Sequence, residues 1–311
     1  MRFKHLFGPV KSRRLGISLG IDLVPHKTCN LNCVYCECGK TTNFTGCRKE
    51  YVSVKEVFSE LDEYLGQHPV LDYITFSGAG EPMLHSKIGK ISGYIKKKFP
   101  EYKLALITNG TLFSYRRMRQ EAAKMDIILP SLDAVSMPVF KKINRPCPGI
   151  LPDKIISGLI RLRQEFKGGI WLEIFIIPGL NDTPSELGLI KNSILKINPD
   201  KIQLNALDRP GTVRGLIKAS SYKLKSIAKY FGEKSEIIAA PEIKLRAKAD
   251  RNNFEKLVFG TLCRRPSTIR DLSVISGVEE VKIKKYLISL RKTVKIDVTR
   301  MKRGNFYKIV K

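Results

Sequence analysis

The sequence lacks the long apolar run that a membrane-spanning helix requires. No stretch of about eighteen consecutive apolar residues occurs anywhere in the 311 residues. The first residues, Met1 to His5, lead into Gly8-Pro9 without the apolar segment of a secretory signal. We therefore expect a cytoplasmic protein without a membrane partner.

Acidic residues are scarce relative to basic ones. The chain has 29 Asp and Glu against 56 Lys and Arg, which gives a formal net charge of +27. Such an excess favours polyanionic partners, nucleic acid first, although a lysine-rich surface without a specific partner is the alternative. The hydrophobic fraction of 43% is that of an ordinary soluble protein, and the length allows one large domain and one small one.

Cysteine occurs seven times, and three of the seven lie within eight residues. Cys29, Cys33 and Cys36 have the spacing C-x3-C-x2-C, so one loop can turn three thiolates toward a metal ion or an iron–sulfur cluster. A structural zinc site has four ligands, and Cys38 or Cys47 would have to supply the fourth. Clustered thiols also fit a reducing compartment better than a disulfide scaffold.

With the aromatic residue Tyr35 before its last cysteine, this stretch resembles the signature of the radical SAM superfamily. The resemblance implies a [4Fe–4S] cluster on Cys29, Cys33 and Cys36, with one open iron that binds S-adenosylmethionine (SAM). It implies that one electron cleaves SAM to methionine and a 5′-deoxyadenosyl radical, which abstracts hydrogen from a substrate. An electron donor such as a ferredoxin or flavodoxin is then a further partner.

Strand-like and helix-like segments alternate after the cysteine loop. The expected strands are 17–23, 73–77, 104–108, 127–131, 171–177 and 201–204. The expected helices are 54–65, with a capping box of Ser53 and Glu56, 88–99, 113–124, 152–166 and 184–197. Repeated β/α units predict a parallel sheet with right-handed crossovers. This α/β pattern suits the partial (β/α)6 barrel that the resemblance implies, in which functional residues lie at the C-terminal ends of strands.

Glycine-rich or polar elements follow these strands. Gly78-Ala79-Gly80-Glu81-Pro82 resembles the superfamily's Gly-Gly-Glu element, which binds the SAM amino group, with Ala79 interrupting the paired glycines. Short polar side chains after the next two strands resemble the contacts to the ribose and carboxylate of SAM. The resemblance thus implies the cofactor-binding residues Tyr35, Gly78, Ala79, Gly80, Glu81, Asn109, Ser131 and Asp133. It assigns no catalytic residue.

The basic segment 7–16, together with the cysteine loop, resembles a branch that includes the wyosine-forming tRNA enzymes and many bacterial relatives. Those enzymes carry a second cluster on cysteines upstream of the SAM motif. No cysteine precedes Cys29 here, so we expect that cluster to be absent, which sets the chain apart from the wyosine reaction itself. Arg13 and Arg14 are candidates for contacting SAM, the cluster or a substrate phosphate.

The last sixty residues follow a different pattern. We expect a radical SAM domain over 1–248 and a small basic domain over 249–311. Three helices (254–263, 268–275 and 279–290) and two strands (294–299 and 306–310) resemble a winged helix-turn-helix. Sixteen Lys and Arg against five Asp and Glu give residues 251–311 a net charge of +11. The basic side chains expected to meet a phosphate backbone are Lys282, Lys284, Lys285, Arg300, Lys302 and Arg303.

Three functions are open at this point. The first is a radical SAM enzyme that acts on RNA, with tRNA as the favoured substrate and the winged helix as a holding domain. The second keeps the chemistry but acts on a protein or a small metabolite, with the winged helix as a docking or dimerisation module. The third is an iron–sulfur redox sensor coupled to a nucleic-acid-binding domain. The series of SAM-site motifs favours an enzyme, because a sensor would need only the cluster.

Overall fold

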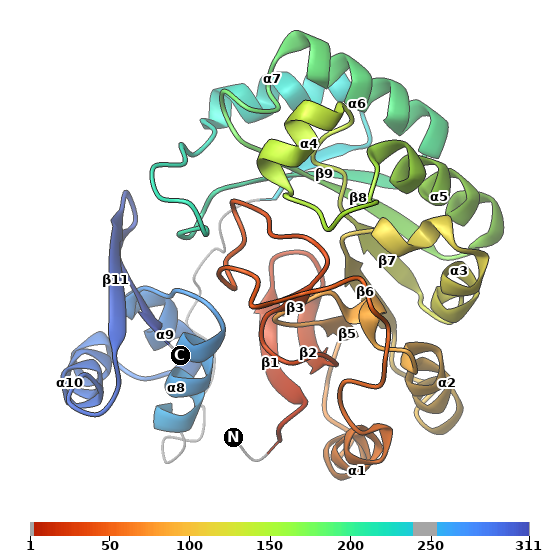
Figure 1. Cartoon of the computed structure of the whole chain (residues 1–311). Helices are drawn as coiled ribbons and strands as arrows, with labels where there is room; N and C mark the ends of the chain where they lie inside the picture. Colours follow the sequence, from red (N-terminus) through yellow and green to blue (C-terminus); the bar gives the residue numbers. More distant parts are fainter. Residues whose placement is uncertain (1–2, 239–253, 311) are drawn as a thin grey trace.

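The computed structural model describes residues 3–238 and 254–310 (Figure 1). Its main element is an eight-stranded sheet with the order β1-β2-β5-β6-β7-β8-β9-β10. β1 (Leu6–Ser12) runs antiparallel to β2, and all later neighbours are parallel. The parallel strands are β2 (Gly16–Asp22), β5 (Tyr73–Ser77), β6 (Leu104–Thr108), β7 (Ile127–Pro130), β8 (Gly169–Ile176), β9 (Lys201–Ala206) and β10 (Ser235–Ile237).

Helices cover the outer face of this curved sheet (Figure 1). They are α1 (Val54–Leu65), α2 (Ile88–Lys98), α3 (Arg116–Ala122), α5 (Pro152–Glu165), α6 (Pro184–Ile197) and α7 (Ser221–Phe231). A short helix, α4 (Met137–Ile143), follows β7. Every second residue of a strand faces these helices, so Leu172 and Ile174 of β8 belong to the main apolar core.

The expected α/β architecture is confirmed, since six of the parallel strands are those predicted from the sequence. α1 and α6 have the expected bounds. The capping box at Ser53 is wrong, because Ser53 makes no side-chain cap and the Glu50 carboxylate accepts from the Val54 amide instead, at 3.0 Å. β1 and β10 were not predicted, and they extend the sheet at its two edges.

The inner face of the sheet changes from apolar to polar along the strands. One part is filled by a small apolar cluster of Leu15, Ala105, Ile127 and Leu129, packed with Tyr73, Ile107 and Trp171. Elsewhere on the inner face, the guanidinium of Arg14 pairs with Glu173, whose other oxygen accepts from Asn205 Nδ2 at 3.2 Å. Arg14 is therefore engaged by the barrel itself rather than by the cysteine loop.

The C-terminal residues form α8 (Phe254–Arg264), α9 (Ile269–Ser276), α10 (Glu280–Leu290) and a hairpin of β11 (Ile296–Met301) and β12 (Gly304–Ile309). They enclose their own apolar core. Three helices and a hairpin are the expected elements, and Thr268 caps α9 in a capping box with Asp271. The expected boundary at 248/249 lies outside the described residues, and the winged-helix assignment stays a prediction.

Buried ion pairs join this C-terminal domain to the barrel. Asp271 of α9 contacts Arg209 at 2.8 Å and Arg303 at 2.6 Å, and Arg303 also pairs with Asp208 of the barrel. The side chains of Asp271, Arg209 and Asp208 are 4%, 7% and 5% exposed. Arg303 thus joins the two domains, which corrects the expectation that it offers its charge to a phosphate backbone.

We predict that Asp271→Ala destabilises the domain junction much more than loss of the α9 cap alone. The change leaves the guanidinium groups of Arg209 and Arg303 without this buried carboxylate, which costs about 3 kcal/mol. Thr268→Ala, the matched control, removes the cap and costs about 1 kcal/mol. Burial alone would raise the pKa of Asp271. The positive charges of Arg209 and Arg303 outweigh burial and hold that pKa below its usual value.

The stabilisation by Asp271 is therefore present above its unfolded pKa of about 3.9 and lost as the pH falls through the folded pKa. Chemical denaturation of both variants at neutral and acidic pH measures this difference. Equal unfolding midpoints for the two variants at neutral pH would show that the ion pairs add nothing to the cap.

Candidate functional site

The three clustered cysteines lie on a loop at the C-terminal ends of the barrel strands. Cys29 ends the short strand β3 (Thr28–Cys29), which pairs with β4 (Asn43–Phe44). The Asn32 and Val34 amides of the loop donate to carbonyls of Asn144 and Ile143, at 3.0 and 2.9 Å. These backbone bonds fix the loop against the end of α4.

Polar side chains from distant segments reach the cysteine sulfurs. Asn109, directly after β6, donates its amide to Cys29 Sγ at 3.7 Å, and Asn144 donates to Cys33 Sγ at 3.5 Å. Lys27 is only 4% exposed and lies close enough to the cysteines to interact with their charge. Amide donors and a buried ammonium both favour the thiolate forms that ligate iron.

The thiols differ in acidity because their surroundings differ. Burial raises the pKa of Cys29 to about 11, against the lowering effect of Lys27. A hydrogen bond from Cys38 lowers the pKa of Cys36 to about 5, and Lys27 adds to this effect against the cost of burial. The same bond and burial raise the pKa of Cys38. The Cys38 thiol also lies 3.7 Å from the Gly78 carbonyl, to which it donates.

The donor set is suited to iron–sulfur ligation, because three thiols share one loop and two of their sulfurs accept hydrogen bonds from asparagine amides. Cys33 interacts electrostatically with both Cys29 and Cys36. Cys47, a suggested fourth zinc ligand, is exposed.

Four of the expected SAM-binding residues meet next to the cysteine loop. Tyr35, Asn109, Ser131 and Asp133 line one cavity of about 30 Å³ together with Cys33. The Tyr35 hydroxyl donates to Asp133 at 2.5 Å, and its ring stacks on Phe175 with centroids 4.0 Å apart. A cavity of this size has room for about one water molecule, far less than the volume of a cofactor site.

The Gly78–Pro82 element is divided between different surroundings. Glu81 is 2% exposed and accepts hydrogen bonds from the Thr108 hydroxyl and the Asn109 amide, both at 2.7 Å, and from the Met83 amide at 3.0 Å. It thereby ties the end of β5 to the end of β6. Gly80 packs against the cysteine loop, since a Cβ there would lie 2.0 Å from the Thr28 carbonyl oxygen.

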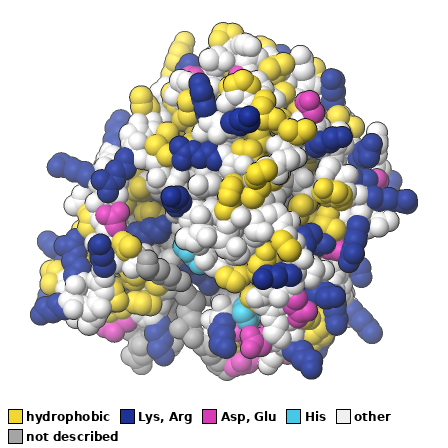
Figure 2. All heavy atoms as spheres, in the orientation of Figure 1, with side chains coloured by type: hydrophobic (Ala, Val, Ile, Leu, Met, Phe, Trp, Pro, Cys, Tyr) yellow, Lys and Arg dark blue, Asp and Glu magenta, His cyan; other side chains and the backbone are white. Residues whose placement is uncertain are grey.

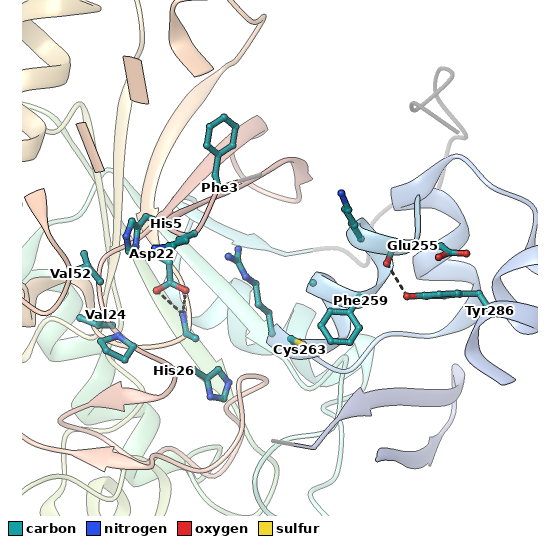
Figure 3. A pocket seen from close by; sticks show the side chains of 16 residues that line it. Phe3, His5, Asp22, Val24, His26, Val52, Glu255, Phe259, Cys263 and Tyr286 are labelled. Carbon is teal, nitrogen blue, oxygen red and sulfur yellow. Dashed lines mark hydrogen bonds between the residues drawn. The ribbon is translucent and has the colours of Figure 1, made fainter. Parts of the chain in front are cut away.

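Ala79 lines a different cavity, of about 640 Å³, between the barrel and α8 (Figure 3). On the barrel side the Asp22 carboxylate accepts from the Ala79 amide at 3.4 Å. On the other side α8 and α10 contribute Phe259, Cys263 and Tyr286, and the Tyr286 hydroxyl donates to the Glu255 carbonyl of α8 (Figure 3). The volume is that of a small-molecule site. Ala79 therefore lines a different cavity from Tyr35, Asn109, Ser131 and Asp133.

Several polar residues at the site were not predicted. Lys27 had a local signal, because it stands two residues before the first cysteine. Asn144 had none, since it is 111 residues from Cys33 in sequence. Asn30 lies inside the cysteine motif, and its side-chain oxygen accepts a hydrogen bond from Asn109 at 2.7 Å. The spacing of the cysteines gives no sign that Asn30 joins the loop to the end of β6.

The family model of the radical SAM superfamily matches residues 23–187, more than half of the chain. The chain belongs to the radical SAM superfamily. Enzymes of this superfamily use a [4Fe–4S] cluster and SAM, so the expected enzyme class and cofactors are confirmed.

Among curated proteins, the chain is 34% identical to a UPF0026 protein of Methanocaldococcus jannaschii, over 80% of this chain and 76% of that protein. It is 36% identical to a protein of Brachyspira hyodysenteriae named GTPase Obg, over 95% of this chain but only 44% of that protein. The chain thus spans less than half of the length of this second relative. A phosphate-binding G-x-x-x-x-G-K-[ST] motif does not occur in the sequence, because the run Gly39-Lys40-Thr41 has Val34 in place of the first glycine.

Solved structures with this fold include a radical SAM methyltransferase from Sphaerobacter thermophilus, at 16% identity and a TM-score of 0.52, over 71% of this chain and 66% of that one. A further similar structure is that of TYW1 with a lysine–pyruvate adduct bound, at 15% identity and a TM-score of 0.49, over 70% of this chain and 74% of that one. These identities are evidence for the fold alone. None of the helices described in the structure is both long and apolar enough to cross a membrane.

We predict that Gly80→Ala lowers the iron content of the reconstituted protein, because the new methyl group would displace the Thr28 carbonyl and with it Cys29. The matched control is Gly46→Ala, where a Cβ has no heavy atom within 4 Å and iron content should equal that of the parent protein. Iron and sulfide analysis after anaerobic reconstitution measures the effect. Full iron content in the Gly80 variant would show that the loop can shift without losing its ligand geometry.

Proposed function

We propose that this enzyme holds one [4Fe–4S] cluster on Cys29, Cys33 and Cys36, cleaves SAM reductively and abstracts hydrogen from an RNA substrate, with tRNA as the favoured class. The observation that carries the proposal is the cysteine loop, in which Asn109 and Asn144 donate to sulfur. Cys29, Cys33 and Cys36 would hold the cluster, which would supply the electron for reductive SAM cleavage, with a ferredoxin- or flavodoxin-type protein as the electron donor.

The side chains of this enzyme supply positioning and charge. Lys27 offsets the negative charge of the thiolates, and the two asparagine amides orient the sulfurs. Glu81 fixes the backbone at the ends of β5 and β6, so its part in SAM binding is to place the strand ends that face the ligand.

Room for SAM arises only if the side chains around Tyr35 separate. The Tyr35–Asp133 hydrogen bond and the Tyr35–Phe175 stack fill the space beside Cys33 in this structure. We propose that Asn109, Ser131 and Asp133 contact SAM after Tyr35 has moved. Ser131 is suited to this role, because its hydroxyl makes no hydrogen bond among the described residues.

The RNA part of the proposal rests on charge. A net charge of +27 favours a polyanionic substrate over a neutral metabolite or an ordinary protein. Lys and Arg side chains are spread over the visible face of the molecule and outnumber the acidic ones (Figure 2). A protein or small-metabolite substrate is the alternative. A redox sensor is disfavoured, since the chain belongs to an enzyme superfamily.

We predict that the anaerobically reconstituted protein contains one [4Fe–4S] cluster and releases 5′-deoxyadenosine from SAM under a strong reductant. Cys33→Ala should abolish both properties because a ligand is lost, whereas Cys47→Ala should keep both because Cys47 is exposed and lies outside the C-x3-C-x2-C motif. Iron analysis and chromatography of 5′-deoxyadenosine measure the two properties. Stoichiometric zinc without SAM cleavage after iron reconstitution would contradict the assignment.

We also predict that tRNA from a strain lacking this gene is missing one modified nucleoside that the parent strain contains. Mass spectrometry of digested tRNA compares the two strains, and a strain complemented with the Cys33→Ala variant serves as the control that should stay deficient. Identical nucleoside profiles in deletion and parent strains would remove tRNA as the substrate and leave the SAM chemistry untouched.

A further inference from the structure

A cavity of about 1170 Å³ lies between the hairpin and the barrel. Its walls come from the residues that follow Cys36, from the loop between β9 and α7, and from β11–β12. We call this cavity the hairpin groove. Its volume exceeds the range typical of small-molecule sites, which favours an extended ligand.

The hairpin groove is rich in basic side chains. Seven Lys and Arg and three Asp and Glu line it. Part of this charge is engaged, because Arg303 pairs with two aspartates and Lys218 lies 3.5 Å from Asp208. Arg214, Arg300 and Lys302 are exposed, and none of the three makes an ion pair or side-chain hydrogen bond within the described residues. These three cations are therefore free to meet an anionic ligand.

One wall of the groove is continuous with the cysteine loop. Lys308 of β12 donates to the carbonyls of Glu37 and Cys38, at 3.3 and 2.8 Å. On the barrel side, the Thr212 amide donates to the Val34 carbonyl at 2.9 Å. Both contacts place the groove beside the segment that carries Cys36, so a ligand lying in the groove runs past the proposed cluster site.

The basic face of α10 has a different position. Lys282, Lys284 and Lys285 are exposed, and the Lys282 ammonium lies over the Phe254 ring at 4.8 Å. None of the residues that line the hairpin groove comes from α10. α10 lies at the edge of the C-terminal domain away from the barrel (Figure 1), so a strand bound there would be remote from the cysteine loop.

We propose that the hairpin groove, rather than the α10 face, binds the phosphodiester backbone of the RNA substrate and leads it to the cysteine loop. This inference rests on the proposed function and names the surface that its substrate uses. Arg214, Arg300 and Lys302 contact phosphates, which position the strand without reading its sequence. Their contribution to affinity therefore falls as the salt concentration rises.

The test compares two full-length variants that each lose three positive charges. The groove variant carries Arg214→Gln, Arg300→Gln and Lys302→Gln, and the α10 variant carries Lys282→Gln, Lys284→Gln and Lys285→Gln. Binding of fluorescein-labelled total tRNA from the deletion strain is measured by anisotropy over a range of salt concentrations. Thermal unfolding and the absorbance of the cluster confirm that both variants are folded.

For the groove variant we expect the dissociation constant to rise about tenfold or more. The slope of the logarithm of the association constant against the logarithm of the salt concentration should become shallower by about 2, because three phosphate contacts are lost. The α10 variant should stay within about twofold of the parent, with an unchanged slope. An α10 variant that loses as much affinity as the groove variant, or a groove variant that keeps parental affinity, overturns the proposal.

Two further outcomes separate this inference from the proposed function. If the unmutated protein cleaves SAM but binds no tRNA even at low salt, the RNA substrate and the groove proposal both fail while the SAM chemistry stands. If the groove variant alone loses tRNA affinity and the parent protein cleaves no SAM, the groove proposal stands while the proposed chemistry fails.

Discussion

The site depends on the interaction between the buried ammonium group of Lys27 and the clustered cysteines. Bringing several thiolates into a buried loop is costly unless opposite charge or hydrogen-bond donors compensate. Lys27 is 4% exposed, and burial alone would lower its pKa. The negative charge of four cysteines, most of all Cys36, outweighs burial and raises that pKa. Asn109 adds a donor to Cys29 from the end of β6, and Asn144 adds one to Cys33 from the end of α4.

These donors are available only because the sheet is parallel. Within the main sheet, β2 and β5 to β10 run in the same direction, so their C-terminal ends meet at one edge and can converge on a single loop. Glu81 strengthens this edge by bonding to Thr108 and Asn109 at the end of the neighbouring strand. Asn109 in turn contacts Cys29, so one buried carboxylate is linked through a single residue to the cysteine loop.

The sequence predicted the elements with strong periodicity and missed those without it. α1 and the six central strands carry apolar residues at regular spacing, and each lies within a few residues of its expected place. β1 was missed because Gly8-Pro9 and basic residues interrupt its alternation, and Leu6 is its only buried residue at the edge of the sheet. The cysteine ligands were found because their spacing is local. The Arg14–Glu173 pair, separated by 159 residues, has no such signal.

The C-terminal domain shows most clearly that the sequence does not reveal which charged side chains are paired. Arg300, Lys302, Arg303 and Lys308 look alike in the sequence, yet their surroundings divide them. Arg303 neutralises buried aspartates and Lys308 binds loop carbonyls, so both hold the domain against the barrel and contribute little free charge. Net charge therefore favours a polyanionic partner, and the proposed binding surface follows only after the cations that make ion pairs or hydrogen bonds within the protein are set aside. Because Lys308 donates to the carbonyls of Glu37 and Cys38, the hairpin lies directly beside the segment that follows Cys36.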